Sequence, residues 1–213
     1  MKLKRAYSPG EILSMKIPSY EFTGQWQAAI GNPAKSGTWI IWGASGNGKT
    51  SFVMQLAKYL CGFGKVIYDS LEEGTSLSFQ KSLKRHGMED TRKSLMDQLS
   101  ERLSRKKSAP IVIIDSFQYS GLSYQAYCEM KERHSNKLLI FISHAEGMKP
   151  EGRPAKKVEY DADVKIFVSC FKAMCKSRFL DHPGEPITVW EEGAAKALLD
   201  EGQKSDEAQE PLV

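Results

Sequence analysis

The chain has 213 residues, of which 41% are hydrophobic and 26% are charged. This length suits one α/β domain with short extensions and leaves too little room for two full domains, and the composition excludes a wholly disordered chain. No apolar run reaches the roughly 20 residues of a membrane helix, and no apolar segment follows the basic start, so we expect a cytoplasmic protein with no membrane partner.

The formal net charge is +4, and it is unevenly distributed. Residues 200–213 contain five acidic residues and one lysine, which gives this end a charge of −4 and leaves +8 on the rest of the chain. An acidic segment without aromatic residues is typical of a disordered tail. We therefore predict an extension over 1–33, a folded domain over 34–199 and a disordered tail over 200–213.

The extension contains Tyr20, Phe22 and Trp26, which give it enough aromatic surface to pack against the domain. A short helix is predicted over 24–30. The breakers Asn32-Pro33 and Ser36-Gly37 then precede the apolar run of residues 39–42, which predicts the first strand.

The segment GASGNGKT follows this strand directly and has the spacing G-x-x-x-x-G-K-[ST] of a phosphate-binding loop. Glycines let successive backbone N–H groups turn inward around an anion, and apolar residues at helical spacing after Gly48 predict a helix whose positive end faces the phosphates. Lys49 is expected to reach the β and γ phosphates, and Thr50 to bind Mg²⁺. The predicted nucleotide-binding residues are Gly43, Ala44, Ser45, Gly46, Asn47, Gly48, Lys49, Thr50 and Ser51.

Strands and helices alternate after this loop. Strands are predicted over 65–69, 109–115 and 138–142, and helices over 76–86, 91–105 and 124–134. This alternation predicts a parallel sheet covered by helices on both faces. The glycine-rich and proline-rich stretch 145–162 is expected to be a long loop. An antiparallel pair over 164–170 and 172–179, a last strand over 187–190 and a short helix over 194–199 complete the prediction.

Several polar side chains come directly after predicted strands, at the sheet edge that carries the phosphate loop. Asp115 ends a buried strand and is predicted to hold Mg²⁺, the alternative being an aspartate that caps the next turn. Glu72 or Glu73 is the predicted catalytic base that deprotonates water, the alternative being solvated acids at a helix start. His144 is predicted to sense the γ phosphate, the alternative being a structural histidine.

Taken together, these segments resemble the RecA-like ATPases, which include RadA, the DnaB-type helicases and the KaiC-type proteins. The resemblance covers about residues 38–190 and rests on GASGNGKT, VIYDSLEE, IVIID and FISH. It implies a RecA-like P-loop NTPase of the α/β class, with a mainly parallel central sheet flanked by helices and antiparallel strands near the carboxyl end. The acids of SLEE are similar to the catalytic glutamate segment of RadA and DnaB, which implies that Glu72 is the better matched base.

The same resemblance implies assembly of several copies. Lys176-Ser177-Arg178-Phe179 is similar to the KNRF segment of RadA, in which the Lys and Arg reach a neighbouring subunit's nucleotide site, although Ser177 replaces Asn and the following glycine is missing. Lys176 and Arg178 are therefore predicted to act in trans within a homo-oligomeric ring or filament. No helical or zinc domain precedes the core, so the chain resembles small phage or mobile-element ATPases of this class.

In this family, mobile loops after the third and fourth strands line the DNA path, and these would be residues 116–123 and 146–160. The second loop carries four cations that could neutralise single-stranded DNA without reading its sequence. These predicted nucleic-acid-binding residues are Lys149, Arg153, Lys156 and Lys157.

The sequence thus predicts a Mg²⁺-dependent ATP hydrolase that acts on nucleic acid in recombination, repair or replication. One alternative is an ATP-driven switch that acts on a protein partner without DNA. Another is a small-molecule kinase, although the acidic end of the strand KVIYDSLEE fits hydrolysis better. ATP is preferred over GTP because no [NT]-K-x-D segment is present.

Overall fold

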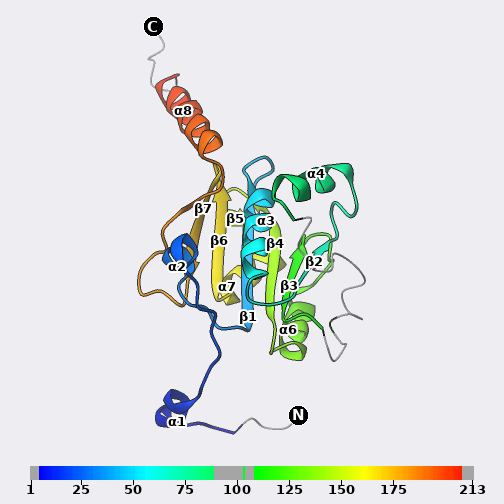
Figure 1. Cartoon of the computed structure of the whole chain (residues 1–213), viewed down its shortest axis with the longest axis vertical. Coiled ribbons are helices and arrows are strands. Elements are labelled where there is room, and N and C mark those ends of the chain that lie inside the picture. The colour runs from blue at the N-terminus through cyan, green and yellow to red at the C-terminus, as the bar shows by residue number, and fades with distance from the viewer. Residues whose placement is uncertain (1–4, 89–102, 104–107, 208–213) are drawn as a thin grey trace.

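The computed structural model describes residues 5–88, 103 and 108–207, and it is built around one sheet with the strand order β2-β3-β4-β1-β6-β7-β8, while β5 pairs with β4 (Figure 1). Strands β1, β2, β3, β4 and β6 are parallel, and β5, β7 and β8 are antiparallel to their neighbours. The predicted mainly parallel sheet with antiparallel strands near the carboxyl end is therefore confirmed. The strands are β1 (Gly37–Gly43), β2 (Val66–Ser70), β3 (Ile111–Asp115), β4 (Leu138–Glu146), β5 (Lys149–Pro150), β6 (Val164–Ser169), β7 (Lys172–Ser177) and β8 (Ile187–Thr188).

Helices cover both faces of this sheet, which explains why the parallel strands read as continuous apolar runs. In β1, Trp39 and Ile41 pack toward the face covered by α2 and α3, whereas Ile40 and Trp42 pack toward the face covered by α6 and α7. The described helices are α1 (Pro9–Ser14), α2 (Gly24–Ile30), α3 (Lys49–Leu60), α4 (Leu77–Arg85), α6 (Tyr124–Arg133), α7 (Arg153–Asp161) and α8 (Glu191–Glu207).

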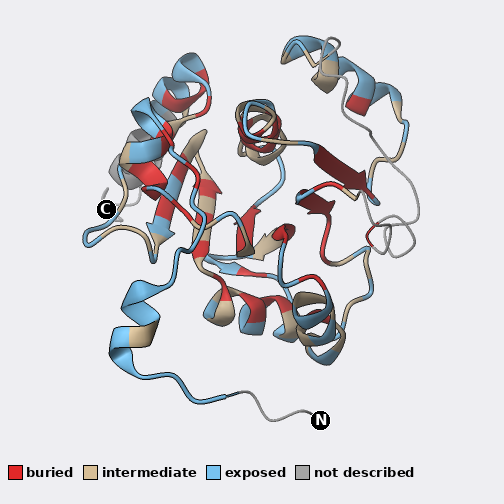
Figure 2. Ribbon diagram, turned by 60° about the horizontal axis from the view of Figure 1, so that its bottom comes forward, coloured by how far each residue is buried: buried red, intermediate tan, exposed pale blue. Residues whose placement is uncertain are grey.

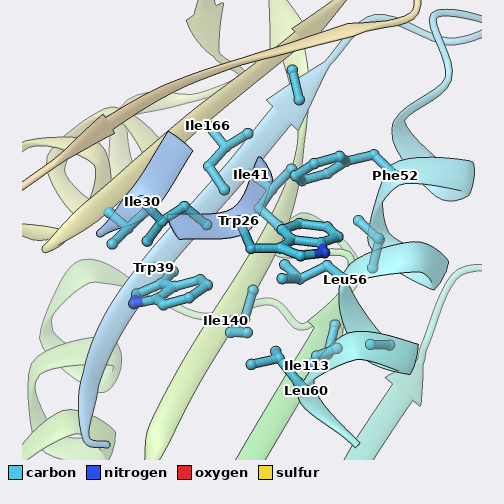
Figure 3. Packing of buried hydrophobic residues seen from close by; sticks show 14 of the residues in the cluster. Trp26, Ile30, Trp39, Ile41, Phe52, Leu56, Leu60, Ile113, Ile140 and Ile166 are labelled. Atoms are coloured by element: carbon cyan, nitrogen blue, oxygen red, sulfur yellow. The ribbon is translucent and has the colours of Figure 1, made fainter. Parts of the chain in front are cut away.

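The larger core cluster joins the extension to the sheet and to α3. Trp26 stacks on Tyr59 with ring centroids 5.1 Å apart and lies 5.8 Å from Phe52, and Phe22 is buried beside Trp39. Figure 3 shows Trp26 and Phe52 packed over Ile41, with Leu56 and Leu60 below them on the same helix. This packing fixes α3, and with it the phosphate loop, on the sheet. By contrast, α1 has no buried residue and stands away from the body (Figure 2).

The stretch predicted as a long loop over 145–162 is instead largely ordered secondary structure, so that prediction was wrong. Strand β4 continues to Glu146, β5 pairs back on it, and residues 153–161 form α7. Pro154 lies in the first turn of α7, where its missing N–H costs nothing, and Ala155 and Val158 are buried on one face. One narrow apolar face was enough to fold a segment that reads as polar.

The carboxyl end also differs from the prediction. Helix α8 begins at Glu191 and continues to Glu207, so residues 200–207, predicted as part of a disordered tail, are helical. Alanine, leucine, lysine and glutamate favour a helix, and Glu191 and Glu192 suit its positive first turn. The helix predicted over 91–105 falls, apart from Leu103, outside the described residues, as do residues 208–213. None of the described helices combines the length and the apolar character that crossing a bilayer requires.

Candidate active site

The phosphate loop joins the end of β1 to the start of α3. Gly46 and Gly48 have φ values of +77° and +89°, in the region that favours glycine. A Cβ on Gly43 would lie 2.3 Å from the carbonyl oxygen of Val168 in β6, and a Cβ on Gly48 would lie 2.9 Å from Cδ1 of Phe171. The motif glycines therefore allow both the turn of the backbone and its close approach to the β6–β7 hairpin.

Lys49 is held across the loop by main-chain oxygens. Its Nζ donates to the carbonyl of Gly43 at 3.3 Å and to that of Ser143 at 3.5 Å. Burial lowers the pKa of the Lys49 ammonium, and the negative charges of Asp115 and Glu72 oppose this shift. The ammonium therefore lies among acceptors that a phosphate could replace.

A cavity of about 310 Å³ lies over the loop, and the ends of β2, β3 and β4 reach it from one side. The structure thus brings together most of the residues that the sequence singled out, although they come from four separate segments. Its lining residues are Ala44, Ser45, Gly46, Gly48, Lys49, Thr50, Ser51, Glu72, Glu73, Asp115, His144 and Phe171.

Asn47, predicted to bind nucleotide, is absent from this lining and has a different position. Its side-chain Oδ1 accepts from the backbone N–H of Cys170 at 2.9 Å, and its carbonyl accepts from the N–H of Phe171 at 3.2 Å. Asn47 therefore ties the phosphate loop to the β6–β7 turn.

Asp115 is held by a tyrosine that sequence reasoning missed. The Tyr68 hydroxyl donates to Oδ2 of Asp115 at 2.5 Å, and the two residues are only 4% and 9% exposed. Burial raises the pKa of Asp115, while this hydrogen bond and the charge of Lys49 lower it. Burial also raises the pKa of Tyr68 well above its ordinary value, so the phenol remains a donor. The alternation of β2 offered a signal, since an inward tyrosine needs a partner, but the partner could not be read from the sequence.

The two neighbouring acids after β2 have different surroundings. Glu72 Oε2 lies 3.0 Å from Nε2 of His144, at the end of β4. Glu73 Oε2 instead accepts from the hydroxyl of Ser78 at 2.9 Å and lies 3.4 Å from that of Ser76, at the start of α4. Glu72 is therefore turned toward the strand ends, whereas Glu73 stabilises a helix start.

Gln118 fixes the segment that carries His144, and no pattern in the sequence singles it out. Its amide nitrogen donates to Oγ of Ser143 at 2.8 Å and to the carbonyl of Glu151 at 3.0 Å, and its amide oxygen accepts from the N–H of His144 at 3.2 Å. The loop after β3, the end of β4 and the segment before α7 are thus joined at one side chain.

Lys176 and Arg178 lie away from this cavity. In the β6–β7 pairing, Lys172 is opposite Ser169 and Ser177 is opposite Val164, so the end of β7 lies where β1 begins. Arg178 pairs with Asp163 at 3.2 Å, and Asp163 accepts from the N–H of Thr38 at 3.0 Å. Neither residue reaches the chain's own phosphate loop, and their action in a neighbouring subunit stays a prediction.

The four predicted nucleic-acid-binding residues lie on β5 and α7 rather than on a flexible loop. Lys149 pairs with Glu159 at 2.8 Å, Lys156 pairs with Glu146 at 2.7 Å, and the Lys157 ammonium lies 5.3 Å from the ring centre of Tyr124. Arg153 is exposed at the start of α7. The cations therefore form a fixed surface on one side of the domain, and several already have partners.

The site offers oxygen ligands suited to Mg²⁺. Asp115 supplies a buried carboxylate and Thr50 a hydroxyl in the same cavity, and Mg²⁺ in such sites takes its remaining ligands from phosphates and water. Among the described residues, no three His, Cys, Asp or Glu side chains form a metal site on their own. The predicted ligands thus fit a metal that binds together with a nucleotide.

Comparisons with solved structures support the fold. The chain is similar to the ATPase domain of a helicase (16% identity, 75% of this chain and 84% of that chain, TM-score 0.52). It is also similar to the flagellar accessory protein FlaH from Methanocaldococcus jannaschii (16%, 76% and 87%, TM-score 0.54) and to a KaiC-like protein from Pyrococcus horikoshii OT3 (16%, 72% and 84%, TM-score 0.51). The predicted RecA-like fold is therefore confirmed.

At the level of sequence, no curated protein matches the chain. A family model described as "Chromatin associated protein KTI12", which represents a P-loop family, matches residues 39–192, from the first strand to the start of α8. Since this match spans well over half of the 213 residues, the chain belongs to the KTI12 family of P-loop proteins.

Proposed function

We propose that this protein is a Mg²⁺-dependent ATP hydrolase that acts on nucleic acid. The observation that carries the proposal is the cavity in which the phosphate loop, Lys49, Asp115 and Glu72 meet. Phosphoryl transfer needs positioned positive charge, a metal ligand and a group that orients the nucleophile, and these residues supply all three.

Each residue has a separate role in this proposal. Lys49 and the loop N–H groups bind the β and γ phosphates, and Thr50 and Asp115 hold Mg²⁺, which neutralises charge on the phosphates. Glu72 accepts the proton of the attacking water, since it faces the cavity and, unlike Glu73, has no helix start to stabilise. His144 orients Glu72 and lies at the strand end where a γ phosphate would be sensed.

A second cavity connects this site to α7. It is lined in part by Ala44, Ser45 and His144, which also line the first cavity, and it continues to Glu151 and Gly152 at the start of α7. A change of contacts at His144 on hydrolysis can therefore be passed through Gln118 to the basic helix.

The surface of α7 is the proposed contact with nucleic acid. Its cations can neutralise backbone phosphates, and Tyr160, which is 86% exposed, offers a ring on which a base can stack. The family description as chromatin associated also supports a nucleic-acid partner. Because Lys149 and Lys156 are paired internally, binding exchanges ion pairs rather than adding new ones, so we expect modest affinity.

Anisotropy of a labelled single-stranded oligonucleotide at rising salt tests this surface. We expect the variant with Lys149, Arg153, Lys156 and Lys157 changed to Gln to bind more weakly and to lose about 0.7 of salt slope for each lost phosphate contact. A variant with Lys16, Lys65, Lys84 and Lys196 changed to Gln removes the same charge elsewhere and is the matched control. Absence of binding by the wild type at low salt would remove the nucleic-acid half of the proposal. Release of phosphate, rather than transfer to a nucleoside or sugar, distinguishes hydrolysis from the kinase alternative.

The region around α1 favours a second candidate function, an ATP-driven switch that assembles with itself or with a protein partner. Tyr7, Ile12, Leu13, Met15 and Ile17 are all exposed along this short arm, which contributes no buried residue to the domain. Light scattering with and without ATP, on the full chain and on a variant with Ile12, Leu13 and Ile17 changed to Ser, tests it. Loss of an ATP-dependent increase in mass in the variant supports this candidate, and an unchanged mass contradicts it.

A further inference from the structure

The order of the strands gives the phosphate cavity a direction. The groups that mark the γ-phosphate end, Glu72, Asp115 and His144, follow β2, β3 and β4, which all lie on one side of β1. On the other side of β1, across the phosphate loop, lie β6, β7 and β8. A nucleotide whose γ phosphate points toward Asp115 must therefore extend its base toward the β6–β7 hairpin.

Phe171 lies at that side of the cavity. It belongs to the turn between β6 and β7, lines the same cavity as Lys49 and Thr50, and packs against Gly48. Both residues of the turn, Cys170 and Phe171, have positive φ values of 49° and 56°, which are uncommon for residues other than glycine. Such strain persists only where surrounding contacts impose it, and it often marks a ligand site.

The turn is held from both sides. Its N–H groups donate to Asn47 of the phosphate loop, and the carbonyl of Phe171 accepts from the N–H of Val189 at 2.8 Å. The carbonyl of Val189 in turn accepts from the Gln55 side chain of α3 at 3.0 Å. The position of the Phe171 ring is therefore fixed by the same loop and helix that would hold the phosphates.

Trp190 supports this ring at its edge. The two rings are perpendicular with centroids 5.1 Å apart, and Trp190 is 53% exposed, whereas the other three tryptophans are buried. A Cβ on Gly193 would lie 2.2 Å from Trp190 and 2.9 Å from Phe171, so the glycine in the first turn of α8 allows this close packing. A large exposed aromatic surface at the mouth of a phosphate site is what a flat heterocycle requires.

We propose that Phe171, supported by Trp190, is the platform on which the nucleobase of the bound nucleotide stacks. The inference rests on the proposed nucleotide site and adds its base-binding half. Stacking on a ring tolerates any base, so the platform supplies affinity for a nucleoside triphosphate over a bare polyphosphate, and contributes little to the choice between ATP and GTP.

Calorimetric titration with MgATP and with Mg-tripolyphosphate, which has the phosphates without the nucleoside, tests the platform. For Phe171→Ala we expect MgATP affinity to fall about 10- to 100-fold, as for loss of one base–aromatic stack, with tripolyphosphate affinity within about twofold of wild type. Phe171→Leu keeps much of the packing against Gly48 and should show the same selective loss, and Trp190→Ala a smaller one. Met174→Ala, on the exposed side of β7 in the same hairpin, is the matched control and should change neither affinity.

Equal losses for both ligands in Phe171→Leu would assign Phe171 to the support of the loop and overturn the platform. Unchanged MgATP affinity in Phe171→Ala would overturn it as well. Failure of the wild-type chain to bind either ligand would overturn the nucleotide site itself, so failure of the proposed function is distinguishable from failure of this inference.

Discussion

Oε2 of Glu72 lies 3.0 Å from Nε2 of His144, although the two residues are separated by 72 positions in the chain. The contact joins the segment after β2 to the end of β4, with β3 between them in the sheet. It distinguishes Glu72 from Glu73, which the sequence alone left as equal candidates apart from a family resemblance.

Glu72→Gln should reduce the ATP turnover number by about 10²- to 10⁴-fold, because the amide cannot accept the proton of water. The affinity for MgATP should stay within about threefold, since the phosphate loop is untouched. Steady-state phosphate release and equilibrium binding measure the two effects. Glu73→Gln is the control and should lower turnover less than about tenfold, because Glu73 is bound to Ser78 at the start of α4. A larger loss in Glu73→Gln than in Glu72→Gln would exchange the two assignments.

Tyr68→Phe removes the hydrogen bond that holds Oδ2 of Asp115 and opposes the effect of burial on its pKa. The pKa of Asp115 should rise further, so the acidic limb of the pH–activity profile should move to higher pH. Because a hydrogen bond to a charged group is involved, the Mg²⁺ concentration for half-maximal turnover should rise by about tenfold near neutral pH. A lower turnover with an unchanged Mg²⁺ requirement and an unmoved acidic limb would show that Tyr68 acts on packing alone.

Asp115→Asn should abolish Mg²⁺-dependent turnover and yet stabilise the fold at neutral pH. Burial raises the folded-state pKa of Asp115 above its unfolded value, so the folded state holds its proton more tightly. Between these two pKa values the wild type therefore loses stability as pH rises, and above the folded value it bears the full cost. The Tm of the variant should exceed that of wild type at neutral pH, and the difference should vanish at about pH 4 and below. A variant less stable than wild type at neutral pH would contradict the stated direction of the shift.

Gly48→Ala should weaken nucleotide binding and the fold more than Gly46→Ala does. Both residues have positive φ, so either alanine costs about 1 kcal/mol of backbone strain. Only at Gly48 does the new methyl meet the Phe171 ring, at 2.9 Å, whereas nothing lies within 4 Å at Gly46. Chemical denaturation should show an additional loss of about 1–3 kcal/mol for Gly48→Ala, as expected for overpacking. Equal losses for the two variants would mean that the hairpin moves aside freely.

Arg178 provides a test of assembly, because it lies at the opposite sheet edge from its own chain's loop. We expect Arg178→Ala and Lys49→Ala each to reduce turnover at least tenfold when assayed alone. Mixing the two variants should restore part of the activity, since one copy then supplies an intact loop and the other an intact arginine. The ion pair with Asp163 is exposed, so Arg178→Ala should cost less than about 1 kcal/mol of stability. Mixtures no more active than their components would contradict action in trans.

The sequence by itself determined the parts of this protein that depend on local geometry. The spacing of Gly43, Gly48 and Lys49 specifies the phosphate loop, because a tight anion-binding turn needs those residue types at those places. Continuous apolar runs specify the parallel strands, and parallel strands bring the residues that follow them to one edge. That is why the order of residues along the chain was enough to assign Asp115, Glu72 and His144 to one site.

The tertiary structure decided what depends on register and on partners far away in the chain. Pairing of Ser70 with Asp115 places Tyr68 beside the carboxylate, and no local pattern encodes that register. The burial of Ala155 and Val158 against the sheet turned an apparently polar loop into α7, since a helix gains its stability from the face it packs. Phe171 reached the cavity because the β6–β7 hairpin folds back over the loop, a contact made by chain segments more than 100 residues apart.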